Sequence, residues 1–162
     1  KSETFTTGKQ LRGSVRIVVR NADGSVDREI ENNNLIVDNM RDVLPELLLQ
    51  SLYTGSRTTT ELQINNMQFG TGLTTPTAAQ TGLQGTVLAT KVLLSTAINR
   101  VSLGHYTMTA TIVAGTDVPI GSVLTEVGLF LQGGVMISRQ LHGATTLNAG
   151  QSAQYTWTYL FQ

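Results

Sequence analysis

The chain has 162 residues, enough for one domain to bury a core without cross-links, and its 11 basic and 11 acidic residues give a formal net charge of zero. The absence of cysteine excludes disulfides and thiolate metal sites, and the balanced charge argues against a nucleic acid or an anionic membrane as partner. No apolar run reaches the roughly 18 residues of a membrane span. We therefore expect one domain with neither kind of partner.

The charges are unevenly distributed along the chain. Residues 1–61 hold eight Lys or Arg and nine Asp or Glu. The rest of the chain has only Lys91, Arg100, Asp117, Glu126 and Arg139, and it is rich in Thr, Gly, Gln and Asn. A surface with few charges repels other copies weakly, so this composition favours assembly.

The first 12 residues predict an extended N-terminal arm ahead of a single domain over residues 13–162. The arm has no hydrophobic period, and Phe5 is its apolar anchor among Lys1, Lys9 and Arg12. One anchor is too little to offset the roughly 1 to 2 kcal/mol per residue that ordering a backbone costs. We therefore expect these residues to contact another chain, by strand addition or by lying along its surface.

Residues 14–53 predict a hairpin followed by one helix. The segment 14–20 alternates like a strand, 21–24 has turn chemistry, and 26–32 returns as the partner strand. Apolar residues then recur at helical spacing, at Met40, Val43, Leu44, Leu47, Leu48 and Leu52. Asp38 and Asp42 are both candidate N-caps; with Asp42 as the cap, Pro45 falls in the first turn, where its amide would have no partner anyway, so we prefer a helix over about 42–53.

The remaining chain predicts strands joined by turns and long loops. We expect strands over about 62–69, 86–95, 100–113, 122–131, 134–141 and 152–161, with a tight turn at Gly133-Gly134. The expected fold is all-β: an antiparallel β-sandwich or jelly-roll-like domain with one short α-helix and the arm.

Few residues offer enzyme chemistry. His105, expected at a strand entrance, and His142, expected in a turn beside Gly143, have no acidic partner at a suggestive spacing. Asp117 precedes Val-Pro and fits a turn. Glu126 interrupts an apolar strand and is expected to form a structural ion pair with Arg139 across the hairpin. Counting from the Gly133-Gly134 turn places the two residues diagonally, Glu126 opposite Leu141 and Arg139 opposite Gly128.

Other patterns have simpler structural explanations. Gly70-Thr71-Gly72 resembles a phosphate-binding loop but lacks the Gly-Lys-Ser/Thr ending, and Asn32–Asn34 and Asn65-Asn66 lack the aspartates of a calcium site. We expect no metal, cofactor or small-molecule substrate. The aromatic residues Tyr155, Trp157, Tyr159 and Phe161 alternate along the last strand. They fit either a core face, which we favour, or an exposed carbohydrate-stacking platform.

Taken together, several short segments resemble small structural proteins of tailed bacteriophage virions. The segments are Asn34-Leu35-Ile36-Val37, residues 67–72 with the loop to Leu83, residues 125–130, and residues 156–161. The resemblance spans about residues 30–162. It implies a β-rich virion subunit without catalysis, located on the capsid as decoration or cement, or on the tail or collar, with other virion proteins and copies of itself as partners. The alternative is a receptor- or glycan-binding β-sandwich module of a tail fibre.

Overall fold

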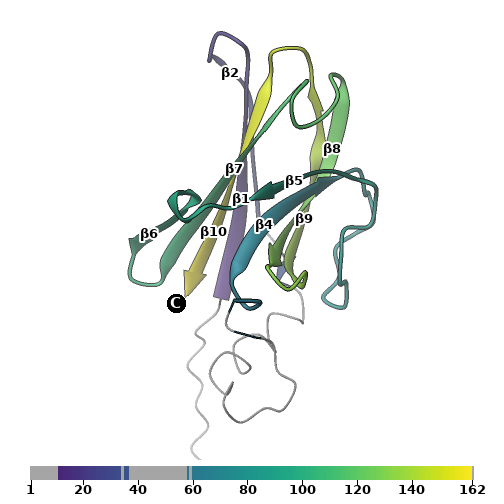
Figure 1. Cartoon of the computed structure of the whole chain (residues 1–162). Coiled ribbons are helices and arrows are strands. Elements are labelled where there is room, and N and C mark those ends of the chain that lie inside the picture. The colour runs from purple at the N-terminus through teal and green to yellow at the C-terminus, as the bar shows by residue number, and fades with distance from the viewer. Residues whose placement is uncertain (1–10, 34, 37–57, 59, 162) are drawn as a thin grey trace, which may run out of the picture.

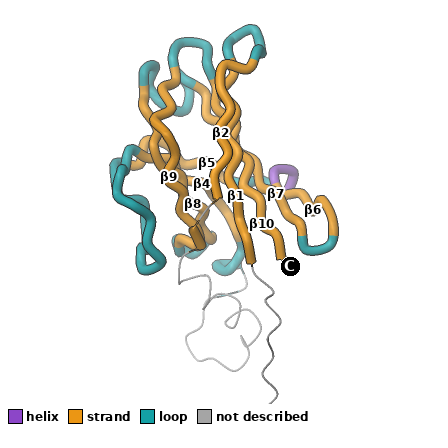
Figure 2. Tube along the Cα trace, turned by 180° about the vertical axis from the view of Figure 1, so that it is seen from behind, coloured by secondary structure: helices purple, strands orange, loops and turns teal. Residues whose placement is uncertain are grey.

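Two antiparallel sheets make up the protein in a computed structural model that describes residues 11–33, 35–36, 58 and 60–161 (Figure 1). The first sheet has the strand order β2-β1-β10-β7-β6 and the second has the order β3-β9-β8-β4-β5. Figure 2 shows the two layers from behind. The all-β, sandwich-like prediction is therefore confirmed. The helix predicted over 42–53 and residues 1–10 of the arm lie outside the described residues.

The strands of the first sheet are β1 (Leu11–Arg20), β2 (Val26–Asn33), β6 (Ile98–Ser102), β7 (His105–Val113) and β10 (Ser152–Phe161). Those of the second are β3 (Leu35–Ile36), β4 (Ile64–Gly70), β5 (Val87–Val92), β8 (Ser122–Leu131) and β9 (Met136–Leu147). A short 3₁₀ helix, η2 (Ser95–Ala97), joins β5 to β6 and is the only helical segment in the part of the chain that the structure describes.

The core lies between the two sheets and follows the alternation of the strands. In the first sheet, β1, β7 and β10 point alternate side chains inward, among them Ile17, Ile112 and Trp157, each at most 1% exposed. The second sheet contributes residues such as Phe69, whose ring meets the Tyr155 ring edge-on at 4.7 Å between centroids. Burial of these apolar faces is the main force holding the two layers together.

Two boundaries differ from the sequence-based expectation. Leu11 and Arg12, assigned above to the arm, belong to β1 because they continue its ladder with β10, opposite Phe161 and Leu160. The single strand expected over 100–113 is two strands, β6 and β7. They are separated by a turn in which Gly104 has a positive φ of 73°, a conformation that glycine adopts without strain.

Strand β9 is also longer than expected, because β8 pairs with it as far as Leu147. His142 therefore lies within β9, and our placement of it in a turn was wrong. The β8–β9 hairpin turns at Gly133-Gly134, where Gly134 has a φ of 81°. Its register places Glu126 opposite Leu141 and Gly128 opposite Arg139, the register counted from the sequence.

Candidate functional site

The loop between β4 and β5, residues 71–86, covers the outer face of the second sheet. Figure 2 shows it as the long loop beside this sheet. Its Leu83 packs on Phe130 and Met136, which point away from the main core. Because this loop covers one face and the first sheet the other, β8 is buried at every position from Leu124 to Leu131.

Glu126 and Arg139 form an ion pair beneath this loop. Arg139 Nη2 lies 2.7 Å from Glu126 Oε2, and both side chains are 0% exposed. Arg139 Nε also donates a hydrogen bond to Glu126 Oε2, at 2.8 Å. The two residues sit diagonally on neighbouring strands, so their long side chains meet on the outer face of the sheet.

The ion pair also holds the loop by its backbone. Glu126 Oε1 accepts hydrogen bonds from the amides of Gly72 and Gly85 at 2.9 and 2.8 Å, and Oε2 accepts one from Gln84 at 3.1 Å. Arg139 Nη1 donates to the Thr74 carbonyl and to Gln80 Oε1, both at 2.9 Å. We call Glu126, Arg139 and the loop groups bound to them the loop clasp.

The environment of Glu126 keeps its carboxylate charged. Burial alone raises the pKa of a carboxyl, but the amides of Gln84 and Gly85, the Arg139 side chain and the Gly72 amide outweigh burial, and the pKa lies below its ordinary value. Five donated hydrogen bonds or ion contacts already occupy the two oxygens. The carboxylate is therefore an anchor and not a proton acceptor for a substrate.

Glycines allow the loop to come this close. A Cβ atom on Gly72 would lie 2.4 Å from Glu126 Oε1, and one on Gly70 would lie 2.8 Å from the same oxygen. The Gly70-Thr71-Gly72 segment thus contributes an amide to an anion-binding arrangement, as phosphate loops do, but the anion is the chain's own carboxylate. The sequence signal for the clasp was a lone acid in an apolar strand combined with a loop rich in glycine.

His105, His142 and Asp117 each lie within a strand or a turn and are separate from one another in the fold. His105 begins β7. His142 is 5% exposed, with its ring 5.6 Å from that of Tyr155, and burial lowers the pKa of His142 to about 4. Asp117 Oδ2 accepts the Val113 amide at 2.8 Å within a turn, and Oδ1 pairs with Lys91 Nζ of the other sheet at 2.6 Å.

The aromatic row of β10 faces the core. Tyr155 and Trp157 are 0% exposed and Tyr159 is 2% exposed. The preferred core interpretation is confirmed for these three residues, and none of them offers a surface on which a sugar could stack. The side chain of Phe161 is outside the described part.

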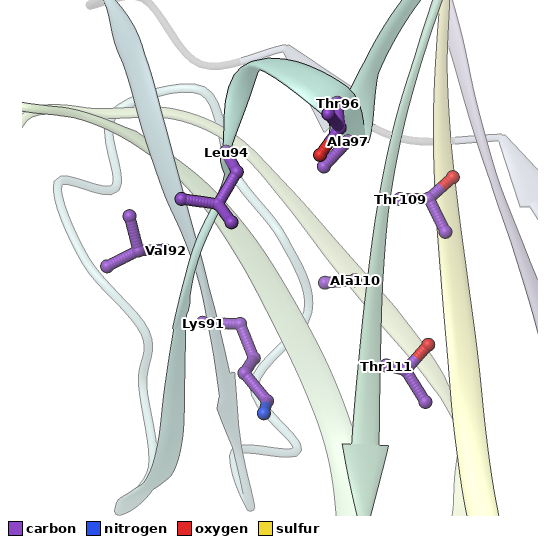
Figure 3. A pocket seen from close by; sticks show the side chains of 8 residues that line it. All are labelled: Lys91, Val92, Leu94, Thr96, Ala97, Thr109, Ala110 and Thr111. Carbon is purple, nitrogen blue, oxygen red and sulfur yellow. The ribbon is translucent and has the colours of Figure 1, made fainter.

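A shallow groove of about 330 Å³ runs between β5 and β7 (Figure 3). Figure 3 shows Lys91, Val92 and Leu94 on one side of it and Thr109, Ala110 and Thr111 on the other. Val92 and Leu94 are 62% and 67% exposed, and the charged group of Lys91 is paired with Asp117. The groove therefore offers apolar contact area but no set of groups for catalysis.

Of the residues predicted to form the assembly arm, only Arg12 is described, as an exposed residue of β1. Lys1, Phe5 and Lys9 lie outside the described residues. Within 11–33, 35–36, 58 and 60–161, no group of three or more His, Asp or Glu is placed to hold a metal ion. The same residues contain no helix with the length and hydrophobicity needed to span a membrane. No family model, curated protein or solved structure matches the chain.

Proposed function

We propose that this chain is a non-enzymatic structural protein of a tailed bacteriophage virion, a capsid decoration or cement protein or a tail- or collar-associated subunit. It would work by assembling with other virion proteins and with copies of itself. Three observations support this proposal: the β-sandwich-like fold, the small number of charged residues after residue 61, and the sequence segments that resemble such proteins.

The main support is a segment in which exposed apolar side chains are concentrated, with almost half of the described large exposed apolar residues in a stretch of 12. Between Val92 and Leu103 five large apolar side chains are exposed, namely Val92, Leu94, Ile98, Val101 and Leu103, with exposed fractions from 38% to 86%. Arg100 is the only charged residue in this stretch. Exposed apolar side chains concentrated in one segment with a single charge are typical of a protein–protein contact.

The acidic residues of the second half support a structural role. Glu126 is held in the loop clasp, and Asp117 closes a turn and pairs with Lys91. Both acids therefore stabilise the fold, and neither is paired with a nucleophile. A subunit that works by summed contacts in a particle needs no catalytic group.

The alternative, a receptor- or glycan-binding module, has weaker support. Its main sequence argument was the aromatic row of β10, and three members of that row are buried. The groove between β5 and β7 is lined by threonines, aliphatic side chains and Lys91, whose charged group is paired with Asp117, and it has no aromatic residue. Sugar recognition would need another surface.

Particle composition tests the proposal. Particles of a phage that encodes this chain should be purified by density gradient and analysed by quantitative mass spectrometry, and the chain should be present at many copies per particle. Its absence from purified particles, with abundant protein in the lysate, would reject the virion assignment.

The arm can be tested in the same particles. Because Leu11 and Arg12 belong to β1, the deletion should end at residue 10. We expect this truncated chain to keep its melting temperature and to be incorporated less than the full chain. Equal incorporation of both chains would show that residues 1–10 are not needed for assembly.

A further inference from the structure

We infer that two copies of this chain associate edge to edge through β6. The β6 strands of the two copies pair antiparallel across a two-fold axis, so that their first sheets join into one continuous sheet. This inference deepens the proposed function by naming a partner and a surface. The observation that leads to it is the exposure of β6: all five residues from Ile98 to Ser102 are exposed. Its two apolar side chains, Ile98 and Val101, are 38% and 52% exposed, so β6 stabilises a lone domain less than a strand whose apolar side chains are fully covered.

The two edges of the first sheet differ in how they are protected. The edge strand β2 carries Asp27, Arg28, Glu29 and Glu31, and charged side chains discourage pairing with another chain. The opposite edge strand, β6, has Ile98 and Val101 and a single charge, Arg100. The β6 edge is therefore the one suited to strand addition.

Backbone alternation shows which groups of β6 face outward. In an antiparallel strand the N–H and C=O groups of one residue point to the same neighbour, and those of the next residue point to the other side. Ala114, directly after β7, donates its amide to the Gln151 carbonyl on the β10 side. Thr107, an odd number of residues away, therefore directs its backbone groups toward β6. Asn99 lies opposite Thr107 and so turns its own groups toward β7. The backbone groups of Ile98 and Arg100 then point to the outer edge of the sheet, with which no other described strand pairs.

Charge and the position of η2 favour one register between two copies, because an axis at Ile98 would oppose Asn99 and Arg100 to residues of the 3₁₀ helix η2 instead of to strand residues. With the axis at Asn99, Ile98 of each copy lies opposite Arg100 of the other, and both outward-facing residues can bond to the partner backbone. An axis at Arg100 would instead oppose two like charges, which destabilises a strand pair. A second copy suits this edge because the chain has no net charge and because this register places the single charge of each strand, Arg100, opposite an aliphatic side chain and not opposite the other arginine.

A cysteine at the axis tests the register directly. Asn99 would face its own counterpart in a pair without mutual hydrogen bonds, where Cα atoms lie about 4.5 Å apart, within disulfide range. The chain has no cysteine, so Asn99→Cys introduces a single thiol. We expect mild oxidation to give a disulfide-linked dimer, while Val26→Cys on the opposite edge strand stays mostly monomeric.

Charge substitutions test the same geometry in the purified, full-length chain. By sedimentation equilibrium we expect the unmodified chain to dimerise and Ile98→Lys to weaken dimerisation at least about tenfold, because the introduced ammonium group would face Arg100 of the other copy. Ile98→Glu should dimerise at least as well as the unmodified chain, because the opposed charges attract. Val26→Lys is the control and should leave dimerisation unchanged.

The outcomes separate this inference from the virion proposal. Two results would overturn the β6 contact. The first is an unmodified chain that stays monomeric. The second is a chain that dimerises equally well with lysine or glutamate at position 98 and whose Asn99→Cys variant forms no disulfide. The virion proposal would survive that result if the chain were found in particles. A β6 dimer of a chain that is absent from particles would keep the contact and reject the virion assignment.

Discussion

A Cβ atom built on Gly85 would lie 2.3 Å from the backbone nitrogen of Gly72, so the two ends of the 71–86 loop touch backbone to backbone. Both residues also donate their amides to Glu126 Oε1, and this shared acceptor is possible only at such a close approach. The hydrogen bonds to the buried Glu126 carboxylate therefore depend on the loop keeping its two ends in contact.

Replacing Gly85 by alanine should therefore separate the loop ends. Gly85→Ala is expected to lower the free energy of unfolding by about 1 to 3 kcal/mol, as overpacking of a close contact does. Urea denaturation measures the change. Gly82→Ala is a matched control in the same loop, because a Cβ there meets nothing within 4 Å. Equal urea midpoints for the two variants would argue against the close contact.

Glu126→Gln should destabilise the protein by about 3 to 5 kcal/mol at neutral pH, because it leaves the Arg139 guanidinium buried without its countercharge. Glu29→Gln is the control, since the Arg16–Glu29 pair is similarly short at 2.6 Å but both side chains are about half exposed. Exposed pairs contribute little, so this control should unfold almost like the unmodified chain. A small effect of Glu126→Gln would mean that the clasp contributes little to stability.

Trp157→Ala should cost about 3 to 5 kcal/mol, the usual effect of removing a large buried aromatic side chain. Trp157→Phe should cost much less, because the indole Nε1 has no hydrogen-bond partner among the described residues and no bond is lost. Leu103→Ala, at an 86% exposed position, provides the surface control. Thermal melting distinguishes the three, and an unchanged melting temperature for Trp157→Ala would contradict the burial of this residue.

The protein should lose stability as the pH falls from about 6.5 to 4. Burial lowers the pKa of His142 to about 4, so in this range the unfolded chain binds a proton that the folded chain does not. The loss from this group should reach about 3 kcal/mol at pH 4 and then level off. His142→Gln should remove this part of the pH dependence in urea titrations at pH 7 and pH 4. An unchanged pH dependence would assign it to other groups.

Glu126 should add to the acid sensitivity at lower pH. Its folded-state pKa is depressed, so its stabilising contribution is fully present above the ordinary carboxyl pKa of 4.5 and is lost as the pH falls through the folded value. The His142→Gln variant should therefore still unfold in strong acid. Combining it with Glu126→Gln should flatten the final part of the curve in urea titrations below pH 4.5, while the exposed carboxyls of Asp23 and Glu29, whose pKa values are also lowered, keep a smaller dependence.

Local sequence patterns were sufficient to predict the positions of most strands and the contact between Glu126 and Arg139. Alternation along β7 and β10 indicated which residues face the core, and counting back from Gly133-Gly134 placed Glu126 near Arg139. Both depend on short-range rules, the two-residue period of a strand and the geometry of a tight turn.

The position of the loop between β4 and β5 on the second sheet could not be predicted from such short-range rules. Residues 71–86 have no hydrophobic period, and their position depends on amides that reach a carboxylate far along the chain. The break between β6 and β7 was missed because apolar residues recur on both sides of Leu103-Gly104, although they change there from odd positions (Val101 and Leu103) to even ones (Tyr106 and Met108). His142 was misplaced because Gly143 signals a turn locally, while pairing with β8 keeps this segment extended.

The pairing of β1 with β10 also affects the order in which the protein folds. β10 lies between β1 and β7, and its ladder joins Leu11 to Phe161. During synthesis the hairpin of β1 and β2 can form early, but its inner edge stays unpaired until the ribosome has released the segment from Ser152 onward. Ribosome-bound chains ending before Ser152 should thus be more sensitive to protease in β1 than released chains. The first sheet is therefore completed only by the last strand, and until then an exposed edge is open to mispairing with neighbouring nascent chains.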